Sequence, residues 1–238
     1  FRKSKILLFL FLPVFLSCVT IDLQTKVNPP LKSYVKIYHT IKILKCTKPF
    51  EETCPIGEYL SMGSGMVVDV IKDQTIVLTA GHVCESKVDT DKISSSVQTV
   101  SVVDYRGLEH DAYVIRATED NSKGSIDMCP LWVPTFKVKG VKFSSFGPKV
   151  GQELYYIGSP AGIYHPGIYS GEIDASNSLV SIPATGGSSG SAVLDLNNNV
   201  VGILWAAHKF HHVSIMTNWH ATSIFLYELT RTYNGEPN

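Results

Sequence analysis

A serine flanked by glycines is the strongest candidate nucleophile in the sequence. Residues 186–192 read Gly-Gly-Ser-Ser-Gly-Ser-Ala, and a turn this rich in glycine allows successive backbone N–H groups to face one point. If Ser189 attacks a carbonyl carbon, its own N–H and that of Gly187 can stabilise the negative oxygen of the tetrahedral intermediate. The run therefore predicts acyl-transfer chemistry at Ser189, with an oxyanion hole formed by Gly187 and Ser189.

A serine hydroxyl becomes an effective nucleophile when a neighbouring base removes its proton, and His82 is the candidate base. It follows the strand-like residues 77–79 and lies at a turn that contains Gly81, so its ring can be held with one edge open. The base needs a carboxylate to orient it. Asp127 begins the apolar segment 127–131 and is the candidate, because its side chain could be partly buried against His82.

Two other aspartates are candidates for the carboxylate that orients His82. Asp111 falls in a predicted strand, and Asp120 falls in the polar segment 118–121, where turn formation already explains it. We therefore favour Asp127 as the third member of a His–Asp–Ser triad.

The same glycine-rich run leaves a second enzyme class open. It also fits the Gly-x-Ser-x-Gly elbow of α/β-hydrolases, with Ser188 as nucleophile. Asp195 and one histidine would then complete an esterase triad, the candidates being His208, His211, His212 and His220. That elbow requires a helix directly after the serine, whereas residues 193–204 read as two strands joined by an Asn-rich turn. The neighbouring histidines lack local carboxylates, so we expect no metal and no other cofactor.

The cysteines indicate a compartment that permits disulfides. Apart from Cys18 near the start, four cysteines remain, which allow three pairings. We favour Cys46 with Cys54 and Cys84 with Cys129, because the second pair would join the segments that carry His82 and Asp127. Four buried thiols are the alternative.

The first residues resemble a targeting segment. Arg2, Lys3 and Lys5 precede the apolar stretch 6–16, which is the layout of a signal peptide and short for a membrane span. We expect a signal peptide or lipoprotein signal over residues 1–18 and a tether over 19–31. The mature chain is then secreted or periplasmic, and lipidation of Cys18 would anchor it to a membrane. The 238 residues carry a formal net charge of zero, so no nucleic-acid partner is expected.

Short apolar runs predict a mostly β fold that ends in a helix. Clusters of Gly, Pro, Asn and Asp separate the predicted strands, which cover residues 34–44, 65–70, 75–79, 98–103, 111–116, 153–158, 191–196 and 200–204. A closing helix is predicted from Trp219 to about Thr230, with Thr217 and Asn218 as caps. Its apolar stripe would contain Ile224, Phe225 and Leu229.

With these motifs in place, the sequence resembles the chymotrypsin-like serine proteases, and among them the HtrA-type proteases. Residues 79–82 (Thr-Ala-Gly-His), 127–131 (Asp-Met-Cys-Pro-Leu) and 187–192 (Gly-Ser-Ser-Gly-Ser-Ala) are similar to the family's histidine, aspartate and serine motifs, in the family's order. Weaker matches at 63–68 and 156–162 extend the resemblance over roughly residues 59–205. Ser191 replaces a commoner glycine, and too few residues follow the last predicted strand for a PDZ domain.

The resemblance implies an all-β fold of two perpendicular six-stranded barrels with a C-terminal helix, and a site in the cleft between the barrels. It implies one trypsin-like domain over residues 32–238, divided near residues 135–150. The implied activity is that of a serine endopeptidase acting on polypeptides. Its specificity pocket would be lined by Pro183, Ala184, Leu204, Trp205 and Ala206, which include no carboxylate and therefore favour small or apolar substrate residues. A catalytically inactive binding protein of the same fold is the non-enzymatic alternative.

Overall fold

The computed structural model describes residues 27–47, 56–85, 92–118, 126–163, 165–174, 178–208 and 213–233. The predicted signal segment, most of the predicted tether and Cys54 lie outside these ranges. Within these ranges, no helix combines the length and apolar character that crossing a membrane requires.

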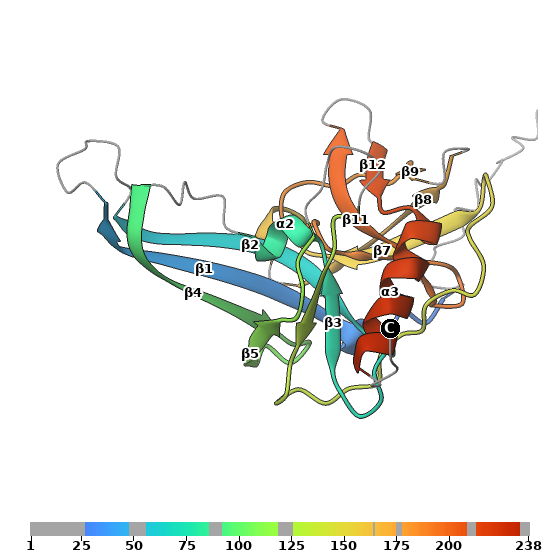
Figure 1. Cartoon of the computed structure of the whole chain (residues 1–238). Helices are drawn as coiled ribbons and strands as arrows, with labels where there is room; N and C mark the ends of the chain where they lie inside the picture. Colours follow the sequence, from blue (N-terminus) through green and yellow to red (C-terminus); the bar gives the residue numbers. More distant parts are fainter. Residues whose placement is uncertain are drawn as a thin grey trace, which may run out of the picture.

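The first six strands close into a barrel in the order β1-β2-β3-β6-β5-β4. Their bounds are Tyr34–Cys46 (β1), Gly57–Val68 (β2), Ile76–Thr79 (β3), Ile93–Val103 (β4), Glu109–Val114 (β5) and Cys129–Trp132 (β6). All four residues of β3 are buried, as expected for a short β-branched strand that pairs with β2 on one side and β6 on the other. Figure 1 shows β1, β2 and β4 running together well beyond the rest of the barrel as a three-stranded extension.

The second unit is a six-stranded sheet in the order β8-β7-β10-β11-β12-β9. Its strands are Glu153–Gly158 (β7), Gly167–Glu172 (β8), Leu179–Val180 (β9), Ala192–Leu194 (β10), Val200–His208 (β11) and Val213–Met216 (β12). Its two edge strands meet at a single bridge between Ile173 and Val180, supported by a hydrogen bond from Ser181 N–H to Glu172 O of 2.9 Å. The sheet is thus a half-closed barrel, so the two six-stranded units of the predicted fold are present and the first of them closes fully.

The C-terminal helix α3 (Trp219–Tyr233) begins where it was predicted and runs three residues further. Asn218 caps it, because its side-chain oxygen accepts the N–H of His220 at 2.9 Å. The predicted apolar stripe is wrong at Ile224, which is 44% exposed. The buried positions are Thr222, Phe225, Leu226 and Leu229, a spacing that follows the helical period and leaves Ile224 outside it.

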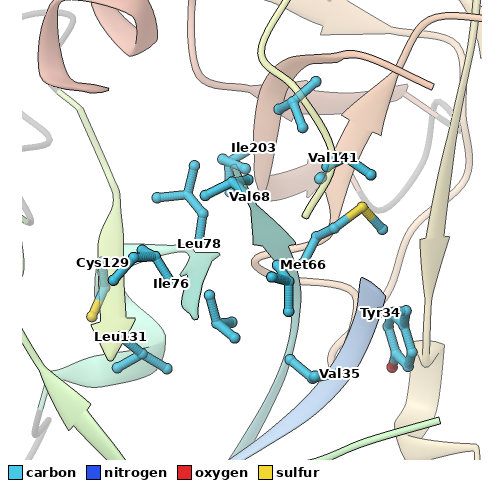
Figure 2. Packing of buried hydrophobic residues seen from close by; sticks show 14 of the residues in the cluster. Tyr34, Val35, Met66, Val68, Ile76, Leu78, Cys129, Leu131, Val141 and Ile203 are labelled. Atoms are coloured by element: carbon cyan, nitrogen blue, oxygen red, sulfur yellow. The ribbon is translucent and has the colours of Figure 1, made fainter. Parts of the chain in front are cut away.

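The described residues form two hydrophobic clusters, of which the larger spans both barrels and the smaller lies within the second unit. Figure 2 shows Met66, Ile76, Leu78 and Leu131 of the first barrel packed in one cluster with Ile203 of β11. Val141, from the connection between β6 and β7, belongs to the same cluster. Because buried side chains from both units share this core, the segments that carry the predicted histidine and serine are held in a defined relation.

A disulfide joins Cys84 of helix α2 (Gly81–Cys84) to Cys129 of β6, and this predicted pairing is confirmed. Each cysteine lies two residues after a predicted catalytic residue, so the bridge ties together the segments of His82 and Asp127. Cys46 is also disulfide-bonded, and its predicted partner Cys54 lies outside the described residues.

Removing this bridge should lower stability. The two cysteines are 45 residues apart, and closing a loop of that length in the unfolded chain corresponds to about 4 kcal/mol in the chain-entropy model. We expect the Cys84→Ala/Cys129→Ala double variant to lose about 2 to 4 kcal/mol of unfolding free energy in urea titrations under non-reducing conditions. A loss below about 1 kcal/mol would contradict a stabilising role for the bridge.

Candidate active site

His82 and Asp127 form a close, partly buried pair. The imidazole Nδ1 lies 2.6 Å from Asp127 Oδ2, and the backbone N–H of His82 donates to Asp127 Oδ1 at 2.8 Å. The aspartate side chain is 4% exposed and the histidine side chain 20% exposed. One hydrogen bond fixes the carboxylate on the His82 backbone, and the other orients the ring, with the proton on Nδ1 and the lone pair of Nε2 available as a base.

The Gly81 turn brings these two groups into contact. A side chain at position 81 would place its Cβ 2.2 Å from the carbonyl oxygen of Thr118 and 2.7 Å from Asp127 Oδ1. Glycine therefore permits the chain carrying His82 to approach the aspartate segment at backbone distance. The competing Asp111 is an exposed residue of β5, and Asp120 lies outside the described residues.

Two of the backbone amides in residues 187–191 of the serine loop have no acceptor. Ser188 N–H donates to Thr185 O at 3.0 Å, Gly190 N–H to Leu204 O at 2.7 Å and Ser191 N–H to Ser188 O at 3.0 Å. Among the described residues, no acceptor pairs with the N–H groups of Gly187 and Ser189. These are the two amides that the sequence predicts for the oxyanion hole.

The orientation of the Gly187 amide follows from its neighbour. The carbonyl oxygen of Gly186 accepts the N–H of Ala161 at 2.6 Å. In a trans peptide the C=O and N–H point in opposite directions, so the N–H of Gly187 points away from Ala161. Gly187 has a φ of +91°, and a Cβ there would lie 2.4 Å from the carbonyl oxygen of Ser159, so glycine is required for this conformation.

Strand β2 lies between the histidine and serine segments and contacts both. The backbone N–H of Ser64 donates to Ser189 O at 2.8 Å. A Cβ on neighbouring Gly63 would lie within 3.0 Å of both the Val83 side chain and Ser189 O, so these two segments converge on β2. In the described part of the chain, neither Ser189 Oγ nor His82 Nε2 has a hydrogen-bond partner, as is common for catalytic groups before substrate binds.

Ser188 lies in a different environment from Ser189. Its side chain is buried, and its Oγ is 3.3 Å from the hydroxyl of Tyr156. The strand β10 follows the loop where an α/β-hydrolase elbow would have a helix, and Asp195 binds the N–H groups of Asn197 and Asn199 in the next turn. The esterase alternative therefore does not fit the fold.

A pocket of about 700 Å³ opens beside Ser189. All five residues predicted to line the specificity pocket are in its wall, namely Pro183, Ala184, Leu204, Trp205 and Ala206. The sequence reasoning missed five further lining residues: Thr185, Gly186, Ser188, His208 and Val213. Val213 reaches the pocket because β12 pairs with the preceding strand β11, which places Val213 opposite His208.

Tyr156 supports the pocket wall from inside the second barrel. Burial is the main cause that raises the pKa of Tyr156 to about 12, with a further contribution from nearby Tyr169. The phenol therefore stays protonated and donates to Pro183 O at 2.9 Å. This hydrogen bond fixes the backbone of the segment that leads into the serine loop.

The model of one protein family matches the chain. Residues 63–203, more than half of the sequence, fit the family described as a trypsin-like peptidase domain. The matched range includes His82, Asp127, Ser189 and half of the residues that line the pocket. No curated relative is similar enough in sequence to count as a match.

Solved structures of proteases share the fold. The active form of the Rv3671c protease from M. tuberculosis is 18% identical, with a TM-score of 0.61 over 87% of this chain and 83% of that chain. The serine endoprotease from Yersinia pestis is 15% identical, with a TM-score of 0.64 over 90% and 68% of the two chains. The inactive form of Rv3671c gives a TM-score of 0.56 at 18% identity, over 83% and 89%.

Proposed function

Since the chain belongs to the family of trypsin-like peptidase domains, we propose that it hydrolyses peptide bonds through a triad of His82, Asp127 and Ser189. The predicted family is confirmed by the match to its model, and membership of a peptidase family supports the enzyme class predicted from the motifs, a serine endopeptidase. The observation that carries the proposed mechanism is the pair of unfilled amides at Gly187 and Ser189, within residues 187–191, whose other amides have partners.

The proposed reaction begins when Ser189 Oγ attacks the carbonyl carbon of the scissile bond. Nε2 of His82 takes the hydroxyl proton, and the carbonyl oxygen becomes an oxyanion that accepts the N–H groups of Gly187 and Ser189. His82 then gives its proton to the leaving amine, so the C–N bond breaks and an acyl-enzyme remains. Water attacks this ester, again with His82 as base, and releases the acid and the free Ser189 hydroxyl.

The pocket walls suit small or apolar substrate side chains. Carbon-rich side chains form much of its lining, and no carboxylate is among its described lining residues. A register shift between Leu204 and Ala206 leaves Trp205 without a partner residue in β12, and we propose that an extended substrate pairs with the backbone there. Lysine or arginine in this pocket would lose hydration without gaining a carboxylate.

Cleavage of a peptide library should therefore favour Ala, Val or Leu over Lys and Arg before the cleaved bond. We expect a preference of at least about tenfold in kcat/KM, the scale on which apolar pockets discriminate. The products are read by mass spectrometry, with the Ser189→Ala variant as the background control. Equal or faster cleavage after Lys or Arg would contradict the assignment of the pocket.

We also propose that the enzyme works outside the cytoplasm, as a secreted or periplasmic protein. The disulfide between Cys84 and Cys129 supports this proposal, because such bonds persist in oxidising compartments. Anchoring through Cys18 would add membrane attachment.

A further inference from the structure

A cluster of buried hydroxyl groups contacts the serine loop through Ser64. Ser64 of β2 is fully buried, and Ser159, just after β7, is 1% exposed. Tyr34, the first residue of β1, is 4% exposed. Strands β1 and β2 of the first barrel and the residue that follows β7 in the second unit therefore each contribute one hydroxyl to the cluster.

The cluster is connected by hydrogen bonds. Tyr34 OH lies 2.6 Å from Ser159 Oγ and 3.4 Å from Ser64 Oγ. The backbone N–H of Ser159 donates to Ser64 Oγ at 3.2 Å. Burial raises the pKa of Tyr34, so its hydroxyl stays protonated and can donate a hydrogen bond within this network.

Ser64 connects the cluster to the serine loop at two points. Its Oγ donates to Gly187 O at 2.8 Å, and its backbone N–H donates to Ser189 O at 2.8 Å. These two carbonyls belong to the residues whose N–H groups form the proposed oxyanion hole. Each peptide group between residues 186 and 190 thus has its carbonyl held by a donor from Ser64, Ala161 or Ser191.

The turn after Ser159 makes a second contact with the serine loop, and residues of β1 form hydrogen bonds with this turn. Ala161 donates to Gly186 O from a left-handed conformation with φ of 54°, a region that a non-glycine residue enters at a cost. Lys36 of β1 donates through Nζ to the carbonyl oxygens of Gly162 and Ile163, at 3.2 and 2.7 Å. Strand β1 therefore fixes this turn through Tyr34 on one side and Lys36 on the other.

We propose that Ser64 is a positioning residue for the oxyanion hole, and that the Tyr34–Ser159–Ser64 hydroxyl network holds the serine loop with the Gly187 and Ser189 amides facing the substrate carbonyl. This inference rests on the proposed function. Without the Ser64 hydroxyl, the carbonyl of Gly187 loses its donor and the Ser159 N–H loses its acceptor, so the loop can rotate peptide groups that it must keep fixed. The substitution should therefore weaken transition-state binding more than substrate binding, because only the oxyanion needs both amides at once.

The test compares Ser64→Ala with Ser33→Ala. Ser33 is a matched control, since it is also a buried serine whose hydroxyl donates to a backbone carbonyl, that of Lys139 at 2.9 Å, away from the site. For Ser64→Ala we expect kcat to fall by about 10- to 100-fold, less than the outright loss of an oxyanion donor, while KM changes by less than about threefold. The affinity for a peptide aldehyde, which forms a tetrahedral adduct, should fall by a similar factor. Ser33→Ala should change kcat by less than about twofold.

The outcomes separate this inference from the proposed function. A wild-type chain that hydrolyses peptides, together with a Ser64→Ala variant of equal kcat and aldehyde affinity, would overturn the positioning role alone. A wild-type chain that hydrolyses no peptide would overturn the proposed function, and this inference with it. If Ser64→Ala fails to fold, Tyr34→Phe removes one hydroxyl of the network and keeps the ring. Its kcat should fall by at least about threefold at unchanged KM, and an unchanged kcat would likewise overturn the inference.

Discussion

Peptide hydrolysis should fall by at least about 10⁴-fold in kcat/KM when Ser189 is replaced by alanine, because the variant has no nucleophile to form an acyl-enzyme. The residual rate would come from binding and from the Gly187 and Ser189 amides, which the substitution leaves in place. The measurement is cleavage of a fluorogenic peptide by purified wild-type and variant chains at equal concentration.

Folding should not account for this loss. The Ser189 hydroxyl has no hydrogen-bond partner among the described residues, so its removal leaves no buried group unsatisfied. Thermal unfolding of Ser189→Ala should therefore match that of the wild type within about 0.5 kcal/mol. The neighbouring variant Ser188→Ala, which changes a buried hydroxyl beside Tyr156, should lower activity by less than about tenfold. If Ser188→Ala were inactive and Ser189→Ala kept its activity, the nucleophile would be Ser188 and the assignment to Ser189 would be wrong.

Replacing Asp127 by asparagine should lower kcat by about 10⁴-fold. In the wild type, the backbone N–H of His82 donates to Asp127 Oδ1 at 2.8 Å. The side-chain oxygen of an asparagine can still accept this N–H, so the turn should keep its shape. Its amide NH₂ would face Nδ1 in place of the carboxylate oxygen at 2.6 Å. The imidazole would then carry its proton on Nε2, where it cannot act as a base toward Ser189.

The control for this variant is Asp111→Asn, which makes the same chemical change on the exposed face of β5. It should leave kcat within about twofold of wild type, and steady-state kinetics of both variants under the same conditions give the comparison. A loss of less than about tenfold in Asp127→Asn would mean that another group orients His82.

The catalytic motifs could be predicted because their chemistry is local. A nucleophile between glycines and a histidine in a glycine turn are visible in short stretches of sequence, and the Cys84–Cys129 pairing followed from bringing two of the motifs together. The strands with clear alternation or continuous apolar runs, such as β1, β3 and β7, were also predictable.

Other elements depend on partners far away in sequence. Strand β8 contains Gly167 and Gly171 and has no buried stripe, so its assignment requires its pairing with β7. Strand β2 begins at Gly57 and not at residue 65, because its exposed first half is held by register pairing with β1. The hydrogen bond from Ser64 to Gly187 could not be predicted either, since 123 residues separate the two in sequence.

The most direct test of the central claim is covalent labelling of the folded, disulfide-bonded chain with a fluorophosphonate, followed by mass spectrometry of the proteolysed product. This reagent reacts with a serine hydroxyl whose proton is removed by a neighbouring base. The proposed triad predicts one labelled position, Ser189, and at least about a hundredfold slower labelling in Asp127→Asn. Labelling at another serine, or no labelling of a folded chain that cleaves peptides, would contradict it.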